Sequence, residues 1–240
     1  MKKTLIIYGG SSEISKHLIH EFNSKYFYFI IFCRNDLKVN KNIKDLDLDT
    51  SRFTIFKADL NNLNLNLELI SKIESKIDGI IWVAGYTGVP DKEILNTKLC
   101  EQNYRVNLIN PVLIINNMLP KLSENSFISI IASLAGIRGR SKRLFYSSAK
   151  GGLINYASGL RQLLWKKNIF VNTVIPGYMD TESFNITAPK FLISKPKDVA
   201  RKIYLSITNK KEITYTNIYW RIISLIIFLL PEKVFKRLNF

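Results

Sequence analysis

Short apolar runs alternate with longer stretches of helical pattern through most of this chain. The runs, several of them rich in Ile, Val and Phe, are Thr4–Tyr8, Tyr26–Cys33, Thr54–Ala58, Gly79–Val83, Ser126–Ala132 and Phe170–Ile175. The helical stretches between them include Ile14–Ser24, Leu67–Ser75, Cys100–Leu119 and Ser147–Lys166. Strands buried on both faces read as short continuous apolar runs, and their alternation with helices is typical of parallel sheets. The sequence therefore predicts an α/β fold with a doubly wound parallel sheet.

A single domain accounts for this pattern. The chain has 240 residues, of which 47% are hydrophobic, enough for one substantial core. No linker rich in Gly, Ser or Pro divides it. We expect a sheet domain over residues 1–210 and an apolar C-terminal segment over residues 211–240. Because ligands bind beyond the carboxyl ends of the strands in such sheets, the residues that follow each strand are the candidates for chemistry.

The first strand is followed by a glycine- and serine-rich loop that runs Gly9, Gly10, Ser11, Ser12, Glu13, Ile14, Ser15. Glycine permits a tight turn and close approach of a phosphate to the backbone, and a helix N-terminus offers free N–H groups. Candidate contacts for a cofactor phosphate are therefore Gly9, Ser11, Ser12 and Ile14. Glu13 and Ser15 replace the usual second and third glycines, so a plain strand-to-helix turn is an equal alternative.

Charged residues follow the second and third strands. Arg34 follows the second strand, where a basic residue can pair with the 2′-phosphate of NADPH and an acidic one with the 2′-hydroxyl of NADH. Arg34 therefore favours NADPH; NADH binding and a merely solvated arginine are the alternatives. Asp59 and Leu60 follow the third strand, where Asp59 can accept a hydrogen bond from the adenine amine or cap the next helix.

Tyr146 and Lys150 form the strongest feature, because a spacing of four places both side chains on one helical face. A lysine ammonium beside a phenol favours the phenolate and lowers the tyrosine pKa from about 10, which makes the phenol a usable proton donor near neutral pH. Such a pair is also common at protein surfaces. Two further residues favour catalysis: Ser133 follows a buried strand, and Asn107 lies in the helix before that strand.

Together these residues resemble the short-chain dehydrogenase/reductase family from Lys3 to about Thr181. The resemblance implies a Rossmann-type fold and an NAD(P)-dependent oxidoreductase that acts on a CH–OH or ketone group. The catalytic residues of the family correspond to Asn107, Ser133, Tyr146 and Lys150. Besides the glycine loop, its cofactor contacts correspond to Ala84, Gly85, Tyr146, Lys150, Pro176, Gly177 and Thr181, with Val83 in place of the family's asparagine.

The mechanism that the resemblance implies is ketone reduction. NADPH delivers hydride to the carbonyl carbon, Ser133 hydrogen-bonds the carbonyl oxygen, and Tyr146 protonates the developing alkoxide. Lys150 lowers the pKa of the tyrosine and holds the nicotinamide ribose. Asn107 positions a water that relays protons from solvent.

A basic loop precedes the tyrosine, with Arg138, Arg140, Lys142 and Arg143 within six positions. A solvated charge run is the usual explanation of such a cluster. However, arginine forks fit phosphate oxygens, and this loop adjoins the catalytic tyrosine. We therefore expect a phosphate-bearing substrate, held by Arg138, Arg140 and Arg143.

The C-terminal segment contains the apolar run Ile222–Leu230, preceded by Trp220 and followed by basic residues. The run is too short for a membrane span, which needs about 20 residues. Aromatic and basic flanks suit a helix that lies in a membrane interface. A core helix or a dimer-interface helix is an equal alternative.

The glycine loop with Glu13, the arginines before Tyr146 and the apolar tail are together similar to the decaprenylphosphoryl-2-keto-ribose (erythro-pentulose) reductase subfamily. This narrower resemblance implies a polyprenyl-phosphate-linked or other phosphorylated keto-sugar of cell-surface polysaccharide synthesis, and an FAD-dependent oxidase as a partner. The wider family implies a homo-oligomer. The alternatives are a reductase of soluble acyl or steroid-like ketones and a non-catalytic NADPH-binding scaffold at a membrane.

The formal net charge of +16 suits an anionic substrate or an anionic membrane surface. Without zinc-finger spacing or an RNA-binding aromatic motif, we expect neither nucleic acid nor metal. Two cysteines, Cys33 and Cys100, are too few for a disulfide framework and suit a reducing compartment. The first apolar run is short and ends in glycines, unlike a signal peptide. We therefore expect a cytoplasmic protein, peripheral at the inner membrane face where its tail binds lipid.

Overall fold

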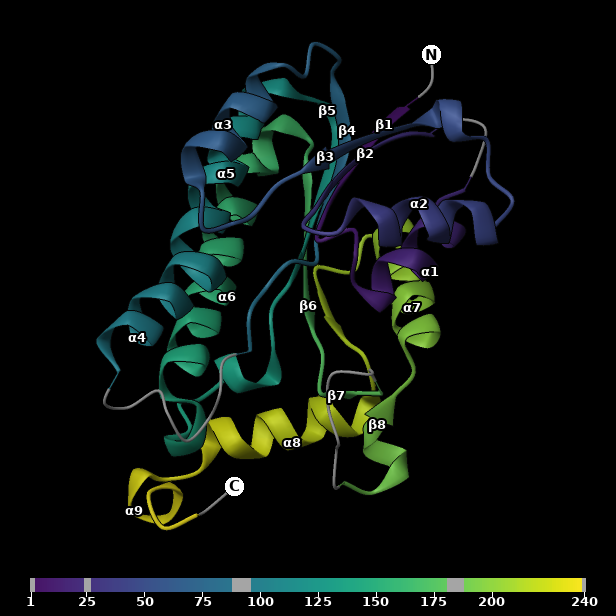
Figure 1. The fold of residues 1–240 in the computed structure, drawn as a ribbon. Coiled ribbons are helices and arrows are strands. Elements are labelled where there is room, and N and C mark those ends of the chain that lie inside the picture. The colour runs from purple at the N-terminus through teal and green to yellow at the C-terminus, as the bar shows by residue number, and fades with distance from the viewer. Residues whose placement is uncertain (1–2, 24–26, 88–95, 181–187, 239–240) are drawn as a thin grey trace.

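The computed structural model describes residues 3–23, 27–87, 96–180 and 188–238 (Figure 1). Within these residues a seven-stranded sheet has the order β3-β2-β1-β4-β5-β6-β9, and each of its strand pairings is parallel. The strand bounds are β1 Lys3–Tyr8, β2 Phe27–Cys33, β3 Phe53–Lys57, β4 Ile77–Trp82, β5 Leu122–Ile131, β6 Phe170–Ile175 and β9 Ile213–Tyr215. The predicted doubly wound parallel sheet is confirmed, and its strand order reverses between β1 and β4.

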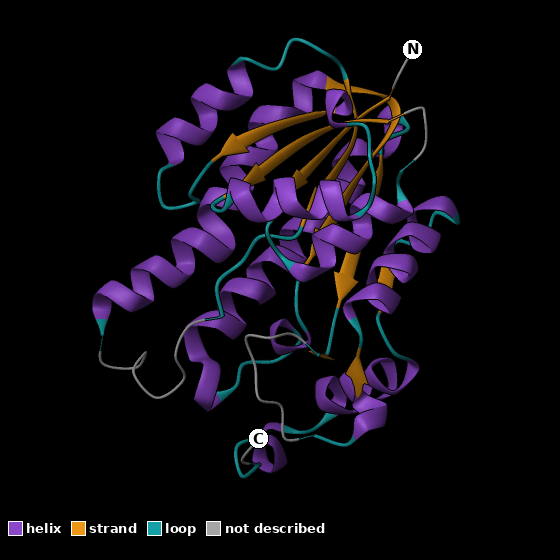
Figure 2. Ribbon diagram, turned by 45° about the vertical axis from the view of Figure 1, so that its right-hand side comes forward, coloured by secondary structure: helices purple, strands orange, loops and turns teal. Residues whose placement is uncertain are grey.

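Helices cover both faces of the sheet, as Figures 1 and 2 show. One face carries α3 Leu63–Ser71, α4 Thr97–Tyr104, α5 Asn110–Met118 and α6 Leu144–Leu164. The other carries α1 Glu13–Glu21, α2 Asp36–Asp45 and α7 Pro196–Thr208. Two C-terminal helices, α8 Ile218–Leu229 and α9 Glu232–Phe235, lie across the end of the molecule at which α6 begins. A separate pair of short strands, β7 Tyr178–Met179 and β8 Ile193–Ser194, lies beside α8.

The core consists of apolar side chains on both faces of the sheet. Tyr8 marks its centre, because its ring stacks on Phe32 at 4.2 Å and on Trp82 at 4.4 Å between ring centroids. The Tyr8 hydroxyl donates to the Asn66 amide oxygen at 3.0 Å, so the buried phenol has a partner. The central strands are thereby fixed directly beneath the glycine loop.

The predicted strand Phe170–Ile175 matches β6, whereas the helix predicted over Leu67–Ser75 begins and ends four residues earlier. The shift follows from capping: the Asn62 side chain accepts a hydrogen bond from Leu65 N at 3.1 Å and starts α3 there. The predicted end of the first helix at Ser24 and the predicted start of the second strand at Tyr26 lie outside the described residues.

The predicted division at residue 210 falls between α7 and β9. β9 pairs with β6 from Thr173 to Ile175, so the central sheet continues into the C-terminal segment. The segment 211–240 thus contributes a strand to the domain before it forms α8.

Candidate active site

A cavity of about 690 Å³ lies at the carboxyl ends of the parallel strands. Its walls come from the glycine loop, the residues after β2 to β6, the start of α6 and the start of α8. Most of the predicted site residues line it: Gly9, Ser11, Ser12, Arg34, Asp59, Leu60, Ala84, Gly85, Ser133, Arg140, Arg143, Tyr146, Lys150, Pro176 and Gly177. The fold therefore brings together residues that are far apart in sequence, at the place where sheets of this kind bind ligands.

The glycine loop turns tightly because of its two glycines. Gly9 has a φ of 97°, in the region that side chains disfavour, and a Cβ there would lie 2.7 Å from Ala84 N. At Gly10 a Cβ would lie 2.1 Å from the Ile31 side chain. The amides of both glycines donate to the Phe32 carbonyl, at 2.8 and 3.0 Å, so the turn is fixed against β2.

Serines complete this loop where further glycines are usual. Ser12 caps α1, and its hydroxyl accepts a hydrogen bond from Ser15 N. The fully buried Ser15 donates its own hydroxyl to the Gly9 carbonyl at 2.9 Å. The helix N-terminus therefore faces the cavity without a third glycine. The Ile14 side chain packs in the core, so only its backbone is available to a ligand.

The far end of the cavity is basic. Arg34 lines it, and so does Lys38, which the sequence analysis did not identify. Asn35 caps α2 by accepting a hydrogen bond from Lys38 N at 2.9 Å, and this turn places both cations at the cavity. The signal in the sequence that could have identified Lys38 is its position one helical turn after Arg34.

Hydrogen bonds fix the loop after β3 at the cavity wall. Asp59 lines the cavity and accepts hydrogen bonds from the Asn61 backbone and side chain, at 2.9 and 3.0 Å. The alternative that Asp59 caps the next helix is wrong, because Asn62 caps α3. The Leu60 carbonyl accepts a hydrogen bond from the buried Asn110 side chain, which fixes the loop at the cavity wall.

Asn107 lies behind the cavity wall and is fully buried. It belongs to a π-helical segment, Arg105–Ile109, which interrupts the single helix predicted over Cys100–Leu119. Its side chain accepts from Tyr86 N at 3.0 Å and donates to Tyr86 O at 2.6 Å. Asn107 therefore fixes the loop that carries Ala84 and Gly85. A Cβ at Gly85 would lie 3.1 Å from both Asn107 Oδ1 and Lys150 Nζ, so glycine keeps this junction open.

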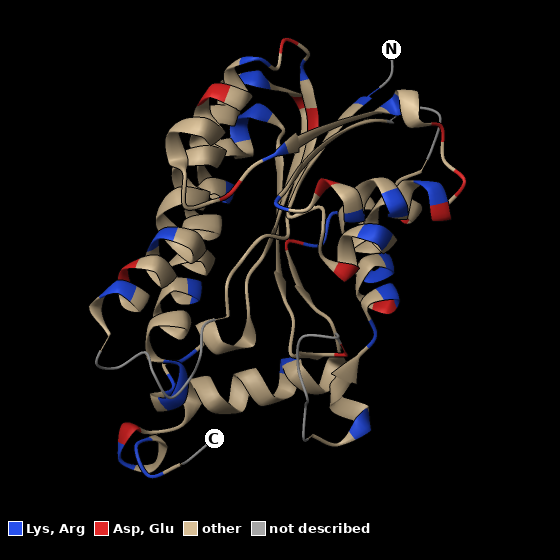
Figure 3. Cartoon of the chain, in the orientation of Figure 1, with Lys and Arg blue, Asp and Glu red and all other residues tan. Residues whose placement is uncertain are grey.

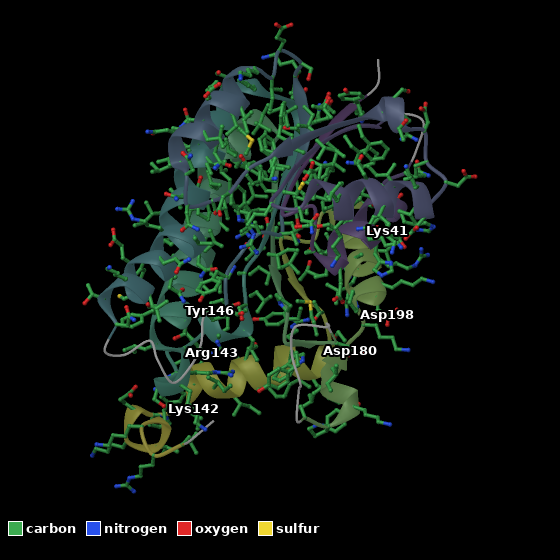
Figure 4. The ribbon with its side chains drawn as sticks, in the orientation of Figure 1. Lys41, Lys142, Arg143, Tyr146, Asp180 and Asp198 are labelled. Carbon is green, nitrogen blue, oxygen red and sulfur yellow. The ribbon has the colours of Figure 1, made fainter. Side chains whose placement is uncertain are left out.

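Tyr146 lies in the first turn of α6 and is half-buried at the cavity wall. Burial raises the pKa of its phenol, while a hydrogen bond with Ser133 and the positive charge of Arg143 lower it. Ser133 begins a short 3-10 turn, Leu134–Gly136, directly after β5. Figure 4 labels Tyr146 and Arg143 close together at the start of α6. The predicted serine and tyrosine are thus adjacent, and an arginine supplies a charge beside the phenol.

Lys150 is 3% exposed, and its Nζ lies 5.9 Å from the centre of the Tyr146 ring. Its ammonium donates to the Ile131 carbonyl at 3.3 Å. Desolvation lowers the pKa of Lys150 from 10.5 to about 8. Perturbed pKa values of this kind are concentrated at functional sites, so the buried ammonium makes Lys150 a candidate functional residue.

Trp220, the third residue of α8, closes the cavity at the end of β6. A Cβ at Gly177 would lie 2.1 Å from the Trp220 ring, so the indole lies directly on the Gly177 backbone. The indole N–H donates to the Leu192 carbonyl at 2.8 Å. From the sequence, Trp220 is expected only as the aromatic flank of an interfacial helix, and its place in the cavity is not predicted. Thr181 lies outside the described residues.

The basic loop before Tyr146 divides into two parts. Arg140 and Arg143 line the cavity, but Arg138 does not. The Arg138 guanidinium donates to the carbonyls of Ile227 and Leu230 and pairs with Glu232 at 2.6 Å. The prediction that Arg138 faces a substrate phosphate is therefore corrected, because the end of α8 occupies its donors.

Other features of the site concern metals and membranes. Among the described residues, no cluster of His, Cys, Asp or Glu could hold a metal ion. None of the helices in the described part of the chain is long and apolar enough to cross a membrane.

The residues present fit a dinucleotide cofactor. The cavity runs from the cations Arg34 and Lys38, past the N-terminus of α1, to Tyr146 and Lys150. The loops that face this path carry glycine at positions 9 and 85. A side chain at either position would crowd its neighbours. A negatively charged pyrophosphate is stabilised at a helix N-terminus, which lies midway along this path.

Known proteins share both the sequence pattern and the fold. A family model described as short chain dehydrogenase matches residues 3–190. The 3-oxoacyl-acyl-carrier-protein reductase FabG of Aquifex aeolicus (strain VF5) is 29% identical over 184 residues, covering 75% of this chain and 65% of that protein. The uncharacterized oxidoreductase YmfI of Bacillus subtilis (strain 168) is 25% identical over 193 residues, covering 79% and 80% respectively. The solved structure of ElxO with NADP bound has a TM-score of 0.79 at 21% identity, covering 92% of this chain and 99% of that one.

Proposed function

The chain belongs to the short-chain dehydrogenase family of oxidoreductases, and from that premise we propose that it reduces a keto group with NADPH. The observation that carries the proposal is the convergence of Ser133, Tyr146 and Lys150 on one cavity. The cations Arg34 and Lys38 at its far end favour NADPH over NADH. The similar solved structure of ElxO holds NADP, which supports this choice, while that of a Brucella melitensis reductase holds NAD.

The residues of this chain act mainly on the oxygen of the substrate. When bound, the nicotinamide supplies the hydride that reduces the carbonyl carbon. Ser133 and Tyr146, which share a hydrogen bond, offer two hydroxyl donors to the carbonyl oxygen. As negative charge develops there, Tyr146 transfers its proton, and the cations Arg143 and Lys150 stabilise the phenolate that remains. Asn107 holds the loop at Gly85 in place through Tyr86.

Removal of the Tyr146 hydroxyl tests this proposal. Tyr146→Phe should leave the Kd for NADPH within about 3-fold, yet reduce kcat by roughly 100- to 10,000-fold, the usual contribution of a positioned acid. NADPH oxidation and NADPH binding, measured on the same samples, separate the two effects. Near-normal turnover in the variant would remove Tyr146 from the mechanism.

We further propose a phosphorylated keto-sugar, carried on a polyprenyl phosphate, as the substrate. Arg140 and Arg143 support it, because both line the cavity next to Tyr146 and arginine forks suit phosphate oxygens. Such a reductase would follow an FAD-dependent oxidase in the synthesis of cell-surface polysaccharide, as the subfamily resemblance implies.

Arg140 and Lys142 provide a matched pair for testing the phosphate contact. Both belong to the basic loop, but Lys142 is exposed and is absent from the cavity lining. Arg140→Ala should raise the KM for a phosphate-bearing keto-sugar by about 10- to 100-fold, as expected for a charge-assisted hydrogen bond, and leave a neutral ketone unaffected. Lys142→Ala should change neither. Equal slowing of both substrates by Arg140→Ala would assign that residue a structural role.

A soluble acyl ketone is the second candidate substrate. Several similar proteins, including those of Bos taurus and Homo sapiens at 25% and 24% identity, are 3-oxoacyl-acyl-carrier-protein reductases. Turnover of an acetoacetyl thioester more efficiently than of any phosphorylated keto-sugar would favour this candidate.

The tail is proposed to lie on an anionic membrane surface. On α8 six apolar residues point outward and are between 52% and 67% exposed: Ile218, Ile222, Leu225, Ile226, Phe228 and Leu229. Tyr219 and Arg221 are exposed as well. Figure 3 shows α8 as a largely uncharged helix that leads into the basic residues of α9 and its surroundings. An apolar face with basic flanks suits a bilayer interface better than water. The enzyme would then be cytoplasmic and peripheral at the inner membrane face; a homo-oligomer that covers this face is the alternative.

A further inference from the structure

Helix α8 touches the two loops that border the catalytic residues. At its N-terminal end, Trp220 packs in a small cluster with Leu134 and Ile175. Leu134 directly follows Ser133, and Ile175 is the last residue of β6. The Trp220 ring also makes an edge-to-face contact with Tyr178 at 5.3 Å between centroids. A residue of the tail thus packs against the backbone after β5 and after β6.

At its C-terminal end, α8 is held by Arg138. The guanidinium donates to the Ile227 carbonyl at 2.8 Å and to the Leu230 carbonyl, both of which lack partners further along the helix. It also pairs with Glu232 and lies 3.9 Å from the centre of the Phe235 ring. The Arg138 side chain is 17% exposed, whereas the Glu232 side chain is 74% exposed, so the carbonyl contacts are the better shielded ones. Arg138 therefore ties the loop that carries Arg140 and Arg143 to the tail.

We propose that α8 is a wall of the substrate end of the cavity, in which Trp220 limits the size of the substrate and Arg138 is a positioning residue that locks the helix against the basic loop. The two contacts lie at opposite ends of the helix, and the two loops that they hold contribute Gly177, Arg140 and Arg143 to the cavity that Tyr146 lines. Displacement of α8 would therefore both open the cavity at Trp220 and release the basic loop that Arg138 holds. The tail is in this sense part of the active site and not an appendage to it.

Trp220 is tested by substrate size. The probes are the small diketone diacetyl and the bulky diketone phenanthrenequinone, with NADPH as the reductant. Trp220→Ala should raise the ratio of kcat/KM for the bulky over the small probe by about 10-fold, because it enlarges a packed pocket. Trp220→Phe should raise it less. Trp165→Ala is the matched control, since Trp165 is 76% exposed and lies beyond the end of α6, and it should leave the ratio unchanged.

Arg138 is tested by hydrogen–deuterium exchange, which does not depend on turnover. Arg138→Leu should speed exchange at least about 10-fold in residues 224–235 and in the loop 137–143, because the carbonyl contacts and the link between them are lost. Lys142→Leu, which alters an exposed neighbour of the same loop, should not. The cofactor end of the cavity, measured by NADPH affinity, should be unaffected by either change.

Two results would overturn the proposal. An unchanged or equally reduced kcat/KM for both probes in Trp220→Ala would assign Trp220 a purely structural role. Unaltered exchange in Arg138→Leu would show that the helix is held elsewhere. If the unmutated protein reduces neither probe nor any keto-sugar, the proposed reductase activity is wrong. Hydrogen–deuterium exchange around Leu134 and Gly177 in Trp220→Ala then tests separately whether α8 forms a wall of the cavity. Exchange that is no faster there than in the unmutated protein would reject that role of α8.

Discussion

Tyr146 is surrounded by opposing influences on its proton. Burial raises the pKa of the phenol, whereas Ser133 and Arg143 lower it. The sequence indicates Tyr146, Lys150 and Ser133 through the family resemblance, because the spacing of the tyrosine and lysine is by itself also common at protein surfaces. It does not reveal the effect of Arg143 on the phenol, because that effect depends on how the loop before α6 folds back. From the sequence, Lys150 is expected to lower the pKa of the phenol, but the cation that lowers it is Arg143 of the basic loop.

The buried charge of Lys150 should lower the stability of the folded protein, although the proposed reaction requires it. In the folded state its pKa is about 8, against 10.5 when exposed, a difference that corresponds to about 3 kcal/mol at pH 7. Lys150→Met removes the buried charge, so the variant should be more stable than the unmutated protein by about 1–3 kcal/mol, while losing reductase activity. Urea unfolding at pH 7 without cofactor measures the difference.

The pH dependence of that difference provides the check. Below about pH 8 the lysine is protonated in both the folded and the unfolded states, and the full difference is present. Between about pH 8 and pH 10.5 the unfolded state binds more protons, so the unmutated protein gains stability and the difference narrows. Lys142→Met, at an exposed site, should show no such trend. A Lys150→Met variant that is less stable at pH 7 would contradict this account.

Arg34 and Lys38 should determine the choice of cofactor. Both line the end of the cavity that would receive the adenosine. Arg34→Ala should weaken NADPH binding by about 1.5–3 kcal/mol, the usual strength of hydrogen bonds to charged groups, and change NADH binding little. Titration of the two cofactors by calorimetry measures the ratio of their Kd values. Equal affinities for NADPH and NADH in the unmutated protein would show that neither cation meets a 2′-phosphate.

At the scale of elements, the six predicted strands are all present in the central sheet, whereas its edge strand β9 was missed. The strand Phe170–Ile175 was predicted to the residue because buried strands are continuous apolar runs. The helix over Cys100–Leu119 was expected to be uninterrupted, and its π-helical segment was missed. In a π-helix each backbone hydrogen bond spans one residue more than in an α-helix. This change does not alter the spacing of the apolar residues in the sequence, although it determines where Asn107 lies. Capping by Asn62 shifted another helix for an equally local reason.

The packing of α6 on the turn after β5 yields a prediction at this scale. A Cβ at Gly136 would lie 2.7 Å from the Lys150 carbonyl carbon and 2.8 Å from Gly151 N, both backbone atoms. Gly136→Ala should therefore push the turn that carries Ser133 away from α6, with a loss of about 1–3 kcal/mol of stability and at least about 10-fold of kcat. Gly139→Ala is the control, because its Cβ would meet nothing within 4 Å. Thermal unfolding and turnover are measured for both variants. Equal stability and equal kcat of Gly136→Ala and Gly139→Ala would contradict this prediction.

At the scale of the whole molecule, one end carries both the cavity and the exposed apolar face of α8. The cavity opens at the carboxyl ends of the strands, and α8 crosses the same end (Figure 1). The sequence predicts the sheet from local patterns and the candidate catalytic residues from the family resemblance. It does not reveal that Trp220 lines the cavity or that Arg138 holds the tail. These contacts join residues some 40 to 95 positions apart, and no periodicity encodes them.

The outward face of α8 leads to a prediction about membranes. Leu225 and Leu229 are 59% and 67% exposed and lie one helical turn apart on that face. If this face enters the interface, burial of its apolar area supplies affinity at about 25 cal/mol per Å², and nearby basic residues add about 1 kcal/mol each at an anionic leaflet. The unmutated protein should therefore co-sediment with vesicles that contain phosphatidylglycerol, and salt should weaken this binding without abolishing it.

The double variant Leu225→Glu with Leu229→Glu should lose vesicle binding, because two carboxylates would have to enter the interface. It should keep its turnover of diacetyl, since neither leucine lines the cavity, which shows that the fold survives. Leu163→Glu is the matched control: Leu163 is 64% exposed on α6, away from the tail, and should bind vesicles as the unmutated protein does. An unmutated protein that ignores vesicles, but changes from an oligomer to a monomer in the double variant, would assign this face to contact between subunits instead of lipid.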